Sequence, residues 1–174
     1  MFAKSSPLVR CLAAFFVCSV SFSGLALTFE EIKEMAEQGE PKAQAVLGSQ
    51  YHHGEGVPQE YKLAIEWITE SAEQGFAPAQ VSLGVMYYYG EGELQDYKQA
   101  FKWSTKAAES GSSNAQLQLG FMYYKGEGVL QDHVKGHMWF NLAAANGLSD
   151  GGKMRDRVAE EMTSDQIAEA QRMA

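Results

Sequence analysis

The chain has 174 residues, 45% of them hydrophobic and 21% charged, which fits one globular domain and excludes an intrinsically disordered chain. The formal net charge is −8, and the chain has no basic stripe. It therefore lacks the positive surface that nucleic acids and anionic membranes require, and we expect no nucleic-acid partner. We interpret the acidity as a contribution to solubility.

The first 26 residues have the pattern of an export signal rather than of a folded element. Lys4 and Arg10 precede the apolar run Leu12–Val20, and small residues up to Ala26 fit a signal-peptidase site. The apolar run is shorter than the roughly 20 residues of a spanning helix. We therefore expect residues 1–26 to be a signal peptide cleaved near Ala26, a periplasmic or secreted product, and no stable membrane insertion afterwards.

Both cysteines, Cys11 and Cys18, lie within this segment. A mature protein without cysteine excludes disulfides, iron–sulfur clusters and thiolate zinc sites. Such a domain has to be stabilised by packing alone.

The predicted mature chain opens with a short helix in residues 27–42. Thr28 and Glu31 have the spacing of a capping box, which predicts a helix over Phe29–Gln38 that ends at Gly39. The sequence Ala-Glu-Gln-Gly at its end returns 36 residues later. We therefore interpret residues 27–42 as a degenerate half-repeat that caps the N-terminal end of an array.

Three copies of one pattern follow, at 43–78, 79–114 and 115–150. Alanine, leucine, glycine, tyrosine and tryptophan recur at intervals of 36 residues, as in Ala79, Leu83, Gly84, Tyr87 and Trp103 of the second copy. A period of this length is typical of a repeat array. The recurring tryptophans are expected to be structural and buried.

Each copy predicts two helices joined by a linker that begins Gly-Glu-Gly. The first helices are expected at 43–53, 79–89 and 115–125, and the second at 60–74, 96–110 and 132–146. After Asp150 the register is lost. Gly151-Gly152 is interpreted as a hinge-like break before two capping helices, Lys153–Met162 and Ser164–Met173, in a C-terminal cap of residues 151–174.

Residues Ala79–Gly111 closely resemble the Sel-one-like repeat, a relative of the tetratricopeptide repeat, with the motif A-Q-x-x-L-G-x-x-Y-x-x-G-E-G followed by Q-D-Y-x-x-A-x-x-W. The third copy departs at His133 and Gly136. The resemblance covers nearly all of the mature chain. It implies an all-α fold, a right-handed α/α superhelical solenoid of helix-turn-helix repeats with terminal capping helices, and a role as a protein-interaction scaffold.

Motifs for catalysis or metal binding are weak. His133 and His137 have i, i+4 spacing but occupy packing positions of the repeat, and no further ligand pattern accompanies them. His52 and His53 are assigned to the surface. Ser149 lies in a G-x-S-x-G, but a helix is expected before it and no histidine follows. We expect no cofactor, no metal and no enzymatic activity.

The outer face of the first helices carries residues that differ between copies. In a superhelix these helices line the concave side, so this face is the predicted partner-binding groove. Its residues are Ser49, His53, Ser82, Val85, Tyr89, Gln118, Phe121 and Lys125.

The leading hypothesis is a non-enzymatic scaffold exported to the cell envelope that binds a protein or peptide in this groove. Two alternatives stay open. One is an envelope hydrolase or penicillin-recognising protein, and the other is a structural protein that self-associates.

Overall fold

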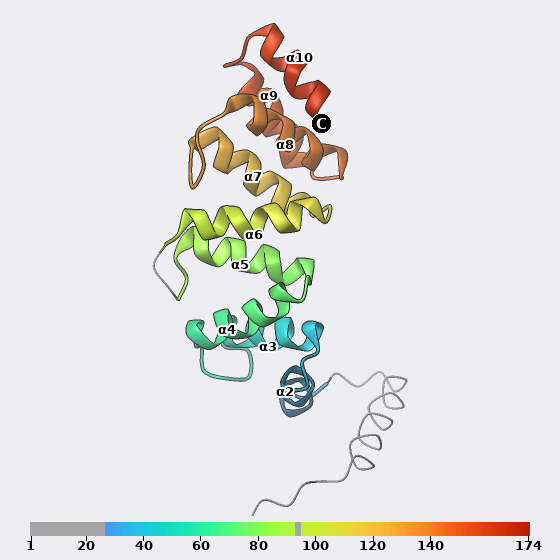
Figure 1. Ribbon diagram of the computed structural model, residues 1–174. Coiled ribbons are helices and arrows are strands. Elements are labelled where there is room, and N and C mark those ends of the chain that lie inside the picture. Colours follow the sequence, from blue (N-terminus) through green and yellow to red (C-terminus); the bar gives the residue numbers. More distant parts are fainter. Residues whose placement is uncertain (1–26, 93–94) are drawn as a thin grey trace, which may run out of the picture.

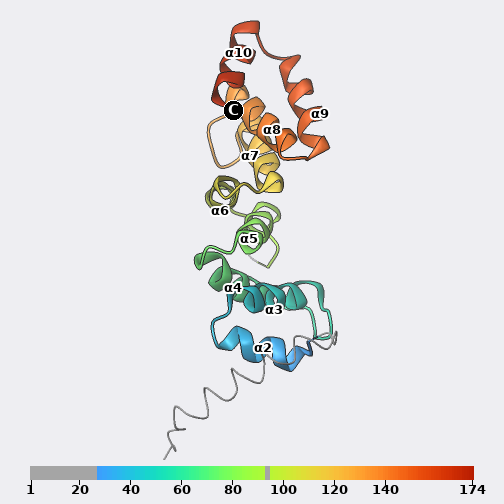
Figure 2. The ribbon, with the colours of Figure 1, turned by 90° about the vertical axis from the view of Figure 1, so that its right-hand side faces the viewer.

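The computed structural model describes residues 27–92 and 95–174, which form nine helices and no strand. Figure 1 shows these helices stacked along one long axis, from α2 at one end to α10 at the other, and the view turned by 90° in Figure 2 shows the same elongated stack. The predicted all-α solenoid is confirmed. The predicted signal peptide, residues 1–26, lies outside the described residues.

The helices form one cap, three pairs and a second cap. Helix α2 spans Phe29–Glu37. The pairs are α3 (Pro41–His53) with α4 (Tyr61–Glu73), α5 (Ala77–Tyr89) with α6 (Tyr97–Glu109), and α7 (Ser113–Lys125) with α8 (His133–Ala145). Helices α9 (Ser149–Ala159) and α10 (Ser164–Met173) follow. Each helix from α2 to α8 packs on the next one in the sequence, and α10 returns to α8. In the part of the chain that the structure describes, no helix has the length and apolarity to cross a membrane.

The helix starts explain most of the differences from the predicted boundaries. The first helices of the pairs begin two residues earlier than predicted. In α3 and α5, Pro41 and Pro78 fit the first turn, where a missing N–H costs nothing, and in α7 the side chain of Ser112 caps the helix start. In the second helices the predicted acidic first residue is the N-cap. The Asp96 carboxylate accepts from two backbone N–H groups and that of Asp132 from one. The capping boxes at Thr28 and Thr163 are both present.

The residues that all three copies share form the buried side of the first helices. Leu47, Leu83 and Leu119 have no exposed surface. The shared glutamines are buried too, and each donates from Nε2 to a carbonyl near the C-terminal end of the preceding helix, as Gln80 does to Ala72 at 3.1 Å. Gln44 and Gln116 do the same to Ala36 and Ala108. Each of these carbonyls also accepts from the backbone N–H of the glycine that follows its helix, so the glutamine adds a second hydrogen bond to a helix end that lies in the core.

The shared glycines of the first helices mark the closest approach within each pair. A Cβ on Gly48 would lie 2.5 Å from Ile68 Cγ1, and one on Gly120 would lie 2.5 Å from two atoms of the Phe140 ring. On Gly84 it would lie 2.8 Å from Ser104 Oγ. Any side chain at these positions would push the two helices of a repeat apart.

The predicted break at Gly151-Gly152 is wrong. Both glycines lie inside α9, which begins at Ser149 rather than at Lys153. A Cβ on Gly151 would lie 2.7 Å from backbone atoms of Phe140 and Ala144, so this glycine lets α9 lie directly on α8. Val158 of α9 and Ala170 of α10 are fully buried, whereas Met173, predicted on the packed face of α10, is 46% exposed.

The three tryptophans differ in burial, although the repeat pattern predicts that all three are buried. Trp103 is buried, with Lys106 Nζ 4.5 Å from its ring centroid, while Trp67 and Trp139 are half-buried. The pattern thus predicts their place correctly but overstates the burial of two of them.

We expect Gly120→Ala to lower the free energy of unfolding by about 1–3 kcal/mol, because the new methyl group overlaps the Phe140 ring. Gly152→Ala is the matched control: its Cβ would meet nothing closer than Ala144 Cβ at 3.8 Å. There the helix preference of alanine should raise stability by about 0.5–1 kcal/mol. Urea denaturation followed by circular dichroism measures both. Equal effects of the two substitutions would contradict the close-approach argument.

Candidate binding groove

A groove of about 530 Å³ lies between α3 and α5, the first helices of the first two repeats. Its wall is mainly apolar, and its polar residues include Lys42, His52, His53 and Glu91. The apolar lining includes Ala45, Val46, Val81, Val85, Phe76 and Pro78.

The groove forms because the two helices present their variable faces to it. In α3 the shared residues Ala43, Leu47 and Gly48 face the core, which leaves Val46 43% exposed on the groove side. In α5 the corresponding residue is Ser82, which is also exposed. Ser49 of α3 is small, so it leaves free volume beside Val85. Small side chains on both walls therefore keep this junction open.

Four of the eight predicted groove residues line this groove: Ser49, His53, Ser82 and Val85. The other four are elsewhere. Tyr89 is 67% exposed, with its ring 5.0 Å from that of Tyr88. The remaining three lie at the next junction, between α5 and α7.

At that next junction larger side chains make direct contacts. Gln118 Nε2 donates to the carbonyl of Gly84 at 3.2 Å, and the Phe121 ring packs edge-on against Phe140 with centroids 5.1 Å apart. Lys125 Nζ lies 3.2 Å from the Tyr88 hydroxyl and 3.8 Å from Glu127. These side chains therefore contact other residues of the protein instead of lining the groove.

Several groove residues were missed by the sequence reasoning, which considered only the outer face of the first helices. Phe76 is the N-cap of α5, Pro78 lies in the first turn of that helix, and Glu91 comes from the Gly-Glu-Gly linker. One signal was available: Phe76 is aromatic where the next two copies have Ser112 and Leu148. A residue that differs from the equivalent residues of the other repeats can indicate a binding site, just as a variable exposed helix face can.

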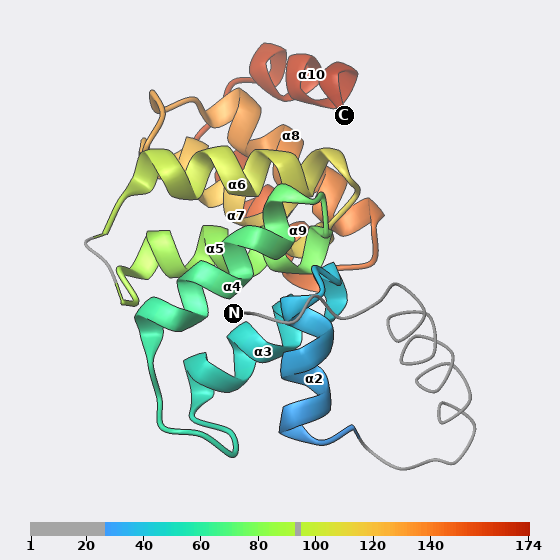
Figure 3. The ribbon, with the colours of Figure 1, turned by 60° about the horizontal axis from the view of Figure 1, so that its bottom comes forward.

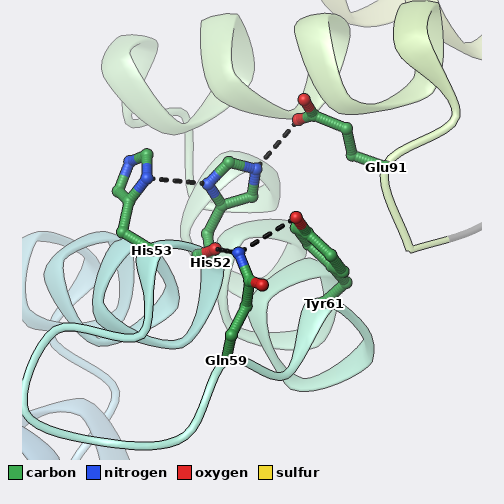
Figure 4. A network of polar contacts seen from close by, with 5 residues as sticks. All are labelled: His52, His53, Gln59, Tyr61 and Glu91. Carbon is green, nitrogen blue, oxygen red and sulfur yellow. Dashed lines mark hydrogen bonds and ion pairs between the residues drawn. The ribbon is translucent and has the colours of Figure 1, made fainter.

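The linker glutamates connect successive repeats in an inter-repeat ladder. His52 Nε2 lies 2.8 Å from Glu91 Oε2 (Figure 4), and the hydroxyl of Tyr88 donates to Glu127 at 2.5 Å. Tyr124 donates to Glu161 of the C-terminal cap at 2.7 Å. The last rung shows that the cap supplies the same carboxylate without sharing the repeat sequence.

The ladder alters the acidity of its tyrosines. Burial, followed by the hydrogen bond to Glu127, raises the pKa of Tyr88 well above its ordinary value. The hydrogen bond to Glu161 is the main cause that raises the pKa of Tyr124. Both hydroxyls therefore act as donors and not as acids or bases near neutral pH.

The described residues contain no group of three or more histidine, cysteine, aspartate or glutamate side chains placed to hold a metal ion. His133 bonds to Gln131 and packs on the Tyr124 ring. His137 is buried, and burial, with a smaller contribution from Arg155, lowers its pKa. Ser149 is the exposed first residue of α9 and follows a helix rather than a strand.

The Sel1 repeat model matches residues 41–76, 77–112 and 113–148. The chain belongs to the Sel1 repeat family. Its Sel1 repeats thus have the 36-residue period that the sequence shows. No curated protein matches the chain.

Two solved structures of Sel1-like repeat proteins are similar to it. One is c5321, a protective antigen of uropathogenic Escherichia coli with an SLR fold, at 43% identity and a TM-score of 0.71 over 72% of this chain. The match spans only 27% of that antigen. The other is a Sel1 repeat protein of Oxalobacter formigenes, at 37% identity and a TM-score of 0.68 over 74% of this chain and 96% of the other.

We expect Tyr88→Phe to lower the free energy of unfolding by about 1–2 kcal/mol, because Glu127 loses its donor. Since the fold raises the pKa of Tyr88, this contribution is complete below the ordinary tyrosine pKa of about 10 and is lost as pH rises through the higher folded value. The difference between wild type and variant should therefore shrink above about pH 10.

Tyr89→Phe is the control for this substitution, because the neighbouring ring is exposed. Its unfolding free energy should stay within about 0.5 kcal/mol of the wild type. Urea denaturation at pH 7 and in alkaline buffers measures all three proteins. Equal stability of Tyr88→Phe and Tyr89→Phe at pH 7 would show that the second rung of the ladder adds nothing.

Proposed function

We propose that this protein is a non-catalytic scaffold exported to the cell envelope, and that it binds a protein or peptide in the groove between α3 and α5. Proteins built from Sel1 repeats are generally scaffolds for protein–protein interaction. The observation that carries the proposal is the groove itself: its volume of about 530 Å³ is suited to a few side chains of a partner, and its lining is mainly apolar.

The partner surface follows from the groove chemistry. Val46, Val85 and Phe76 offer apolar contact, which favours an aliphatic or aromatic anchor on the partner. Lys42 and Glu91 offer one charge of each sign at the wall, so the anchor would be flanked by polar or charged groups. Repeat arrays commonly bind extended segments along such a surface.

Export is supported by the signal-peptide pattern of residues 1–26.

Crosslinking and pull-down from the native envelope tests binding in the groove. Val46→Glu and Ser82→Arg change side chains that line the groove and are exposed, so both should abolish capture of the partner without altering the melting temperature. Glu109→Arg, at an exposed position of α6, is the control and should capture the partner normally. Undiminished capture by both groove variants would disprove binding at this place.

Export has its own test. Protein recovered from the envelope should lack residues 1–26, so its mass and its N-terminal sequence should begin at Leu27. Recovery of only the uncleaved chain in the cytoplasm would contradict export without affecting the binding proposal.

A further inference from the structure

The C-terminal cap packs on the third repeat at a position that is apolar in the other two repeats. His137 of α8 stands where α4 has Ile65 and α6 has Phe101. Both of those residues meet the first helix of the next repeat. Ile65 shares a buried cluster with Leu83 of α5, and the Phe101 ring packs edge-on against that of Tyr123 of α7, with centroids 5.4 Å apart. Helix α9 takes the place of a next first helix on α8 (Figure 2), so His137 faces the cap.

His137 is buried there without a full set of partners. It is 2% exposed, and its Nδ1 has no hydrogen-bond partner among the described residues. A neutral imidazole has one N–H donor and one acceptor nitrogen, whereas the protonated ring has two donors and a charge. Adding a proton would therefore place a charge and an unpaired N–H in this junction, which is costly as long as α9 excludes water from it.

The cap also brings a positive charge close to this histidine. Arg155 of α9 donates from Nη1 to Asn141 Oδ1 at 3.2 Å, and Asn141 lies one helical turn after His137 on α8. Burial and then Arg155 lower the pKa of His137, while the carboxylate of Asp156 acts in the opposite direction. The neutral ring is thus the form that fits the docked cap.

The other groups at this end of the stack respond to pH outside the range of histidine. The remaining charged residues of α9, Asp150, Lys153 and Arg157, are exposed. Helices α7 and α10 also pack on α8. Their titratable side chains are Tyr123, Tyr124, Lys125, Asp165, Glu169 and Arg172. Phenols, carboxylic acids, ammonium and guanidinium groups ordinarily titrate outside pH 5–7, and histidine titrates within it.

We propose that acid opens the C-terminal cap: protonation of His137 releases α9 and α10 from the third repeat. The released histidine binds a proton more readily than the docked one. Docking is therefore complete above the ordinary histidine pKa of about 6.5 and weakens as the pH falls below it. Release uncovers the surface of α8 on which Gly151 lies, at the end of the array.

Hydrogen exchange followed by mass spectrometry at pH 7 and pH 5 tests the cap, with rates corrected for the intrinsic effect of pH on amide exchange. If only the released form binds the proton, its population grows in proportion to 1 + 10^(6.5 − pH), which is an increase of up to about 25-fold between the two pH values. The amides of α9 and α10 should lose protection by up to this factor. Those of α5 and α6 should keep theirs, because these helices contain no histidine.

The second repeat supplies the variant. His137→Phe introduces the residue that α6 has at this position, so protection of the cap should be the same at both pH values. His133→Tyr is the matched control, since tyrosine stands at that position in the first two repeats, and it should respond to pH as the wild type does.

Arg155→Gln separates a proton effect from a packing effect. The side chain of Arg155 is 34% exposed, and without its charge the docked His137 accepts a proton more readily, so the loss of protection at pH 5 should be smaller than in the wild type. Equal protection of the wild-type cap at pH 7 and pH 5, or an equal loss in the wild type and His137→Phe, would overturn the proposal. If His137→Phe does not fold, an undiminished loss in Arg155→Gln would overturn it.

Discussion

The structure depends on the close contact between the two helices of each repeat. A glycine of the first helix lies where a Cβ would overlap the second helix, against Ile68, Ser104 and Phe140 in the three repeats. The opposing residue changes in size and polarity, but the glycine does not. Because each repeat stacks on the one before it, a wider spacing in one pair would displace every helix beyond it.

Polar contacts fix how successive helices and repeats are aligned with one another. The buried glutamines donate to carbonyls at the end of the preceding helix, and the inter-repeat ladder joins each repeat to the next through a carboxylate. Figure 3 shows the result, with the successive first helices α3, α5 and α7 displaced along the stack. All these contacts connect nearest neighbours, so stability is distributed along the array rather than concentrated in one core.

The sequence predicted the architecture well because repetition is itself structural information. Letters that recur every 36 residues, such as Leu83 and Gly84, are those that neighbouring helices constrain, and the structure buries them. The N-caps and capping boxes were predictable for another reason: they depend only on residues a few positions apart in the sequence. Gly151 was misread because a glycine that permits close packing and one that breaks a helix look alike in a sequence.

The groove was predictable only in part. Helical periodicity identifies an outer face, and Ser49, Ser82 and Val85 do line the groove. It does not reveal that Phe121 meets Phe140, or that Gln118 reaches the Gly84 carbonyl, because those partners are on other helices. It also does not place Glu91, a linker residue, beside His52 of the preceding repeat.

The first junction is where this array departs most from its own pattern. A small Ser49 stands where the third repeat has Phe121, and the pair His52-His53 stands where the second has two tyrosines. The two departures lie on the same groove. His52 still bonds to the linker glutamate as Tyr88 does, so the exchange of tyrosine for histidine keeps this rung of the ladder. The stacking contacts can thus stay constant while the chemistry of one junction changes.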